Sequence, residues 1–273
     1  MGCNKCNRNL DGGGKLIINT TPADATVIFN TGKVNGHQTI VKKGTVVTYN
    51  VSKNGYYGTS GTVTVNSNQT INVSLEQKHY NDGQTIYESA SGGVSTTLNL
   101  QTSGRYQVIC IGGGGGAAEY HKKSFLTGWY KAATGGSGSG FDCIFMLTKG
   151  NYAVQVGNSG AGKLTNSYPV NASNGGNSRF GDSYAYGGCG GNIQNASAFT
   201  AGVAGTAPTL TYTVISSTLN QAGNQGMTST TIYTPAQGGA SLYGSYGKGG
   251  DAVTDDSKVN GTAGYVKVIF LGK

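Results

Sequence analysis

The sequence is poor in proline and in long apolar runs, and each shortage excludes a class of protein. Only 4 prolines accompany 48 glycines in 273 residues, and no Gly-X-Y period appears, which excludes a collagen triple helix. No apolar run approaches the roughly 20 residues that cross a bilayer. The first residues also lack the apolar core of a signal peptide. We therefore expect no membrane insertion and no export by the standard route.

Residue sets typical of catalysis are missing as well. The three histidines stand outside any zinc-protease motif, and the 11 acidic residues are scattered. Residues 157–164 nearly match a P-loop, but a leucine follows the lysine where a magnesium-binding Ser or Thr is required. Residues 112–117 imitate a dinucleotide fingerprint without the βαβ unit that it needs. We expect no enzyme and no cofactor.

Charge and cysteine content set further limits. Lys and Arg outnumber Asp and Glu by 19 to 11, but they are dispersed, whereas nucleic-acid binders cluster them on one face, so we expect no nucleic-acid partner. Cys3 and Cys6 form a lone C-x-x-C, for which a metal or a disulfide both stay open, and we predict no other metal ligands. We expect Cys110, Cys143 and Cys189 to be buried free thiols, which indicates synthesis in a reducing compartment.

Glycine, by contrast, is abundant. Its share of 48/273, roughly 18 %, compares with an average of about 7 %. Such a composition is often disordered, yet hydrophobic residues reach 36 % here, and 17 Tyr and 7 Phe fall in short alternating runs. Alternation indicates β-strands, and no stretch has helical spacing. The sequence therefore predicts an ordered, all-β protein.

The N-terminal part predicts a small β-sandwich after a polar tail at residues 1–14. Residues 15–76 contain five runs rich in β-branched residues and separated by turn dipeptides. These runs are residues 15–20, 25–30, 45–52, 59–65 and 70–75. Residues 22–27, 43–56 and 61–65 look like a PEGA-type domain, a small sandwich of bacterial surface and phage structural proteins. That resemblance implies a spacer or binding module.

The composition of the chain changes after a polar linker at residues 77–93. Residues 94–273 alternate strand-like runs with glycine tracts, and glycine inside a strand costs about 0.5–1 kcal/mol relative to alanine. One compensation is the extended threefold polyglycine II helix, whose N–H and C=O groups must bond to neighbouring helices. We predict a second β-sandwich that carries packed polyglycine helices. The long non-glycine insertion at residues 193–237 argues against a full lattice.

Five motifs in this region carry a second resemblance. They are residues 104–116, 135–141, 150–157, 174–181 and 264–270. In this order they look like the glycine-rich domain of many phage fibre and adhesin proteins, and more distantly that of certain receptor kinases. The resemblance implies a jelly-roll-like sandwich with polyglycine II segments, displaying loops to a host receptor. It also implies a virion protein made in the host cytoplasm and oligomeric among other virion proteins.

Aromatic residues concentrate between the first two glycine tracts, and they are the candidate contact residues for a receptor or glycan. They are Tyr120, His121, Trp129 and Tyr130. Aromatic faces pack on sugar rings and anchor interfaces. The alternative is that these side chains form a satellite core. The leading hypothesis is a tail- or head-fibre protein, or a surface decoration, that attaches to a bacterial glycan or protein. The rival is a purely architectural capsid- or tail-associated subunit that contacts only other phage proteins.

Overall fold

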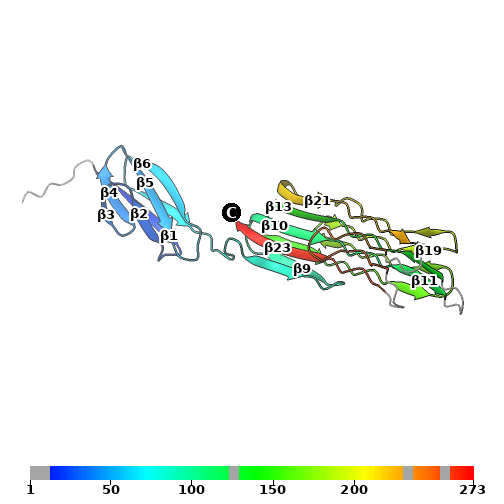
Figure 1. The fold of residues 1–273 in the computed structure, drawn as a ribbon. Helices are drawn as coiled ribbons and strands as arrows, with labels where there is room; N and C mark the ends of the chain where they lie inside the picture. Colours follow the sequence, from blue (N-terminus) through cyan, green and yellow to red (C-terminus); the bar gives the residue numbers. More distant parts are fainter. Residues whose placement is uncertain (1–12, 123–128, 230–235, 253–258) are drawn as a thin grey trace, which may run out of the picture. The chain divides into compact units, whose positions relative to one another are not determined.

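The computed structural model describes residues 13–122, 129–229, 236–252 and 259–273, which form strands and turns without a helix (Figure 1). The chain divides into two compact units, the first ending at His79 and the second beginning at Tyr80. The prediction of an all-β chain of β-sandwich type is confirmed. Cys3 and Cys6 lie outside the described residues.

The first unit is a sandwich of two sheets with strand orders β3-β4-β1-β7 and β2-β5-β6. Its strands are β1 (Gly13–Thr21), β2 (Thr26–Phe29), β3 (Lys33–Asn35), β4 (Gln38–Lys42), β5 (Thr45–Ser52), β6 (Thr59–Val65) and β7 (Gln69–Ser74). Alternate residues point inward, so that Leu16, Ile18, Val47 and Val65 are fully buried between the sheets. The predicted bounds of β5 and β6 are confirmed. The short strands β3 and β4 were missed.

The second unit begins with a larger sandwich, whose sheets have the orders β21-β13-β10-β23-β8 and β18-β17-β14-β9. Its strands are β8 (Thr85–Ser89), β9 (Ser95–Leu100), β10 (Gly104–Ile111), β13 (Gly140–Leu147), β14 (Gly150–Gln155), β17 (Ser178–Phe180), β18 (Ser183–Ala185), β21 (Val214–Gln221) and β23 (Tyr265–Gly272). Aromatic side chains, among them Tyr106, Phe145 and Phe270, fill the core. The linker prediction for residues 77–93 was wrong in part, because β8 lies within it and pairs with β23.

The thiols of this unit are free, as predicted for Cys110 and Cys143, which are buried in the sandwich core. Desolvation raises the pKa of both thiols above the ordinary range, so they stay protonated. Cys189 is only half-buried and belongs to a glycine tract.

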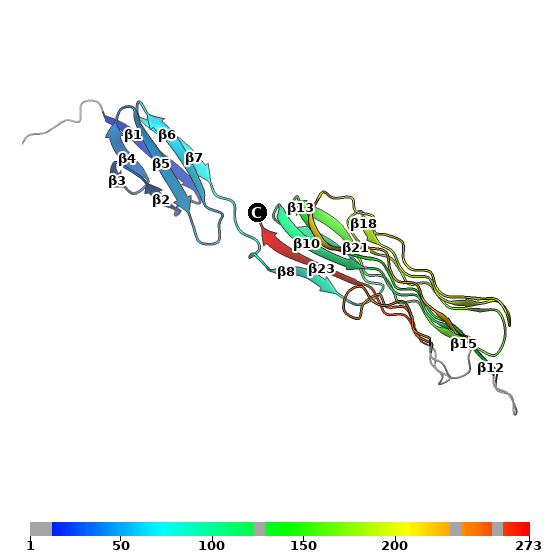
Figure 2. The ribbon, with the colours of Figure 1, turned by 45° about the horizontal axis from the view of Figure 1, so that its top comes forward.

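Beyond the sandwich, extended tracts run side by side toward the far end of the unit (Figures 1 and 2). Two tracts lie at the centre. Residues 112–117 follow directly after β10, and residues 134–139 lead into β13. Eight perimeter tracts surround them among the described residues. They are residues 157–162, 172–177, 186–191, 201–206, 222–227, 236–240, 247–251 and 259–264.

Hydrogen bonds of the central tracts repeat every three residues. The N–H groups of residues 112–117 donate, in order, to the carbonyls of Ser139, Gly176, Thr262, Gly136, Ser173 and Val259. Every third acceptor lies on the same neighbouring tract, so the donor direction turns by one third of a revolution per residue. This is the geometry of a polyglycine II helix. The second central tract repeats the pattern, with acceptors at Met227, Gly250, Cys189, Asn224, Gly247 and Tyr186.

Carbonyl groups of the central tracts accept from three further neighbours. In the first tract the carbonyls of Gly113, Gly114 and Gly115 accept from Gly188, Gly160 and Gly250, respectively. Each central tract is therefore bonded to six others, and the two share two of these neighbours. Two such centres in a hexagonal array need eight surrounding tracts, which matches the perimeter set. The backbone groups that lack partners inside a polyglycine helix are thus satisfied laterally.

Close approach explains the glycine content. A Cβ atom built at Gly114 would lie under 3.0 Å from the backbone carbonyl oxygen of Lys248, a distance that real Cβ atoms do not show. A Cβ at Gly115 would meet the carbonyl of Cys189 in the same way. Larger residues are accepted where their side chains bond to the lattice. Ser137 Oγ, for example, accepts the N–H of Asn224 at 2.7 Å.

One expectation from the sequence is corrected here. Residues 193–237 were expected to interrupt the lattice, but they supply two perimeter tracts, residues 201–206 and 222–227. The segment that imitates a P-loop is another perimeter tract, residues 157–162, and its Gly160 N–H donates to the carbonyl of Gly114.

Candidate functional site

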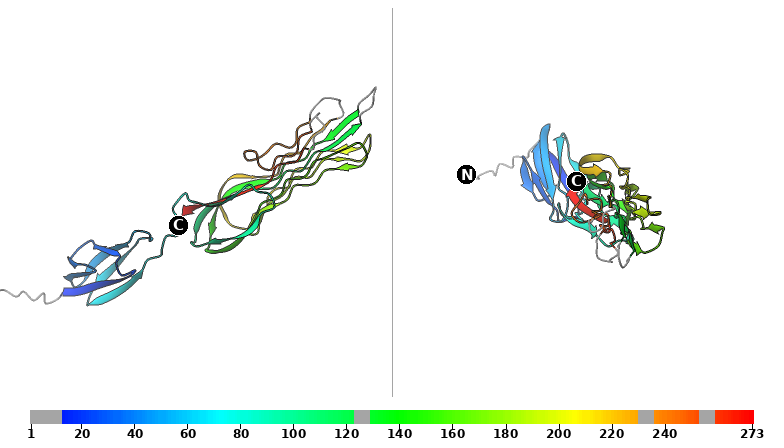
Figure 3. Two further views of the ribbon diagram at one scale, coloured as in Figure 1. Left: turned by 90° about the horizontal axis from the view of Figure 1, so that it is seen from below. Right: turned by 45° about the vertical axis from the view of Figure 1, so that its right-hand side comes forward.

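Seven short strands that adjoin the tracts lie at the end of the bundle away from the sandwich, a region that we call the tip (Figure 3). Its strands are β11 (Ala118–Lys122), β12 (Trp129–Ala133), β15 (Lys163–Thr165), β16 (Val170–Asn171), β19 (Asn192–Ile193), β20 (Phe199–Thr200) and β22 (Thr228–Ser229). They form two small sheets, β15-β11-β12-β22 and β16-β19-β20. Segments far apart in the sequence therefore share one end of the second unit.

Tyr120 lies in the interior of the tip. Only 8 % of its surface is exposed, and its ring stacks on Tyr168 with centroids 4.0 Å apart and an interplanar angle of 12°. Ala118, Val170 and Ile193 complete this small core. Burial, and then the neighbouring Tyr120, raise the pKa of the Tyr168 hydroxyl. The structure thus gives Tyr120 a packing role within the candidate site.

The other predicted contact residues lie on the same hairpin. His121 is half-buried, and the strand alternation puts it on the face opposite Tyr120, together with the buried Glu119. His121 pairs with Tyr130 across the hairpin, and Lys122 pairs with Trp129. The structure therefore brings the four predicted residues together along β11 and β12. The side chains of Trp129 and Tyr130 lie outside the description, so their contact role stays a prediction.

Sequence reasoning missed other members of the tip. Lys131 Nζ lies 5.2 Å from the centroid of the Phe199 ring, a cation–π arrangement. Lys163 is exposed on β15, which pairs with β11 in parallel. These residues come from separate loops, and a single sequence gives no signal that their segments meet.

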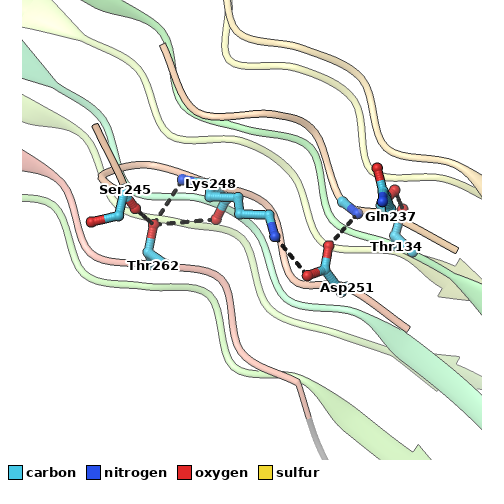
Figure 4. A network of polar contacts seen from close by, with 7 residues as sticks. Thr134, Gln237, Ser245, Lys248, Asp251 and Thr262 are labelled. Carbon is cyan, nitrogen blue, oxygen red and sulfur yellow. Dashed lines mark hydrogen bonds and ion pairs between the residues drawn. The ribbon is translucent and has the colours of Figure 1, made fainter. Parts of the chain in front are cut away.

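A polar network ties the tract at residues 247–251 to two neighbouring tracts (Figure 4). Asp251 accepts a hydrogen bond from the Gly238 N–H at 2.8 Å and pairs with Lys248 Nζ at 2.6 Å. Thr262 Oγ1 accepts the Lys248 N–H at 2.7 Å and donates to the Ser245 carbonyl at 2.9 Å. Three perimeter tracts, residues 236–240, 247–251 and 259–264, are tied together in this way.

The described residues contain no group of three or more His, Cys, Asp and Glu side chains placed to hold a metal ion.

Within the described ranges, no helix long and apolar enough to cross a membrane occurs.

Two family models match the chain, one on each unit. Residues 89–272 match the family described as "Glycine-rich domain". The chain belongs to the glycine-rich domain family. Residues 15–74 match "Head fiber dimeric protein-like domain". This match stands where a PEGA-type domain was expected, and no comparison supports the PEGA resemblance. No curated protein matches the chain. The two matches support a structural protein of a phage fibre.

Proposed function

We propose that this protein is a non-enzymatic head-fibre subunit of a phage particle whose tip contacts a bacterial surface glycan or protein. In this proposal the first unit takes part in dimeric assembly on the virion, together with other virion proteins. The description of the family that matches residues 15–74 supports both the fibre role and the dimer.

The observation that carries the attachment role is that strands from distant parts of the sequence meet in two small sheets at the tip. Backbone hydrogen bonds hold the bundle together, and they do not depend on the side chains that the connections present. A rigid support of this kind lets loops of different sequence be displayed in a fixed arrangement, as binding loops commonly are. Aromatic and basic residues at the tip, such as Tyr168 and Lys131, suit sugar rings and anionic groups.

The test is adsorption to host cells of purified protein that carries Trp129→Ala and Tyr130→Ala. We expect binding to fall by at least about tenfold, the loss typical of interface aromatics, with the unfolding midpoint unchanged. Met146→Ala is the matched control, because Met146 is 56 % exposed on the sandwich and away from the tip. Unchanged adsorption of the double variant would contradict the receptor contact and favour the architectural rival.

A further inference from the structure

Strand β6 has a free edge in the first unit. Among the described residues it pairs only with β5 in the β2-β5-β6 sheet, over seven residues without a register shift (Figures 1 and 2). The Thr48 N–H bonds to Asn30 Oδ1, so Thr48 turns its backbone toward β2, and its neighbours Val47 and Tyr49 turn theirs toward β6. Their partners Val63 and Gly61 therefore direct their N–H and C=O groups toward β5.

It follows that Ser60, Thr62 and Thr64 direct their N–H and C=O groups away from the sheet. An independent contact agrees, because the Thr64 carbonyl accepts a hydrogen bond from Gln69 Nε2 at 2.9 Å instead of one from β5. Unpaired groups in such a row are a template for another strand.

The devices that normally protect an edge are absent from β6. It contains no charge, no proline and no bulge, and residues 62–65 are all β-branched. The other sheet edges among the described residues carry features of this kind or are short. β21 pairs with two register shifts, β8 carries Glu88, and Tyr80 Oη bonds to the backbone of Asn99 and Gln101 along β9. The edge strands β2, β3, β15, β16, β18, β20 and β22 have four residues or fewer.

Charge distinguishes β6 from β7, the remaining long edge. The exposed face of the β2-β5-β6 sheet carries Thr, Ser and Asn with Ile28 and Val46, and none of these side chains is charged. The sheet that ends in β7 carries Lys15 and Lys42 on its outer face. A twofold contact brings the same patch of both copies together, so a neutral patch fits itself whereas two like charges repel.

We infer that the second copy in the dimer binds along β6, so that the two β2-β5-β6 sheets join into one through antiparallel β6–β6 pairing. This inference rests on the proposed head-fibre function. One register uses all the outward N–H and C=O groups of β6. In it, Thr62 lies opposite Thr62 of the second copy, and Ser60 lies opposite Thr64 of the second copy. The Gln69 side chain gives up the Thr64 carbonyl to the incoming N–H.

Light scattering and sedimentation of the full chain test this inference. We expect the wild type to have twice the chain mass of 27.9 kDa. Thr62→Lys puts like charges opposite each other at the centre, and Thr62→Pro removes an N–H that folding of the subunit does not use. Each should raise the dimer dissociation constant by roughly tenfold or more. Thr70→Lys on β7 makes the same charge change at an exposed site and should leave the dimer intact.

The outcomes separate two failures. A wild type that stays monomeric at every concentration would refute the proposed dimeric function itself. A wild-type dimer that persists in both Thr62 variants, or that dissociates only in Thr70→Lys, would overturn the β6 assignment and leave the dimer standing. Val46→Lys tests face-to-face packing, and dissociation in that variant alone would also overturn edge pairing. Circular dichroism confirms that each variant is folded.

Discussion

Gly114→Ala tests the physical basis of the bundle most directly. Gly114 stands in the first central tract, where its N–H donates to the Thr262 carbonyl at 2.9 Å and its carbonyl accepts the Gly160 N–H at 2.7 Å. The added methyl group would lie under 3.0 Å from the Lys248 carbonyl oxygen, which is backbone and cannot rotate away. The tract must therefore shift, and both hydrogen bonds lengthen.

Three terms set the expected magnitude. Overpacking of a rigid interior costs about 1–3 kcal/mol. Weakening two lateral hydrogen bonds adds about 1 kcal/mol each. Alanine also restricts the unfolded chain, which offsets this destabilisation by about 0.5–1 kcal/mol. The free energy of unfolding of the second unit should fall by about 2–4.5 kcal/mol, although alanine normally stabilises extended backbone relative to glycine.

Chemical denaturation followed by tryptophan fluorescence measures this loss, because Trp129 is the only tryptophan and belongs to the second unit. Gly58→Ala is the control, since a Cβ there would come no closer than 3.3 Å to the Val51 carbonyl in the first unit. We expect its tryptophan transition to match the wild type. A Gly114→Ala transition within about 0.5 kcal/mol of the wild type would refute tight lateral packing, because that is the range of ordinary surface substitutions.

Three further measurements follow from the structure. Amide hydrogens of the two central tracts should exchange with deuterium as slowly as those of the sandwich strands, and rapid exchange would mean that the lateral bonds do not form. Ser137→Ala leaves the Asn224 N–H without its 2.7 Å acceptor and should cost about 1–3 kcal/mol in denaturation, whereas a neutral effect would argue against the contact. The hydrogen bond from Tyr265 and the ion pair with Lys267 lower the pKa of Glu88 below its ordinary value of 4.5. The stabilising contribution of Glu88 should therefore be present at neutral pH and be lost as pH falls through that lowered pKa. The difference in unfolding midpoint between wild type and Glu88→Gln should then disappear on acidification. A difference that stays constant with pH would contradict this assignment.

Much of the fold was predictable because it follows from local patterns. Alternation located β5 and β6, since a half-buried strand must alternate, and the glycine tracts indicated threefold helices, since only glycine allows such close approach. The strands at the edges were harder. β8 is short, and its pairing with the C-terminal β23 is a contact across almost the whole second unit. The short strands of the tip, such as β16 and β19, likewise exist only because distant tracts bring them together.

The candidate site was predictable only in part. Aromatic clustering marked the β11–β12 hairpin, but it gave no means to tell an internal ring from an exposed one, and Tyr120 proved to be internal. Its stacking partner Tyr168 arrives on another connection, as does Phe199 beneath Lys131. No local pattern records such meetings.

The sequence alone determined which segments can pack backbone against backbone, because each glycine in these segments lacks a Cβ atom. Tertiary structure decided which tract bonds to which, since a polyglycine helix has no internal hydrogen bonds and takes its partners from wherever the chain returns. It also decided that residues 193–237 join the lattice: Gly202 and Gly205 each donate to a carbonyl of the second central tract.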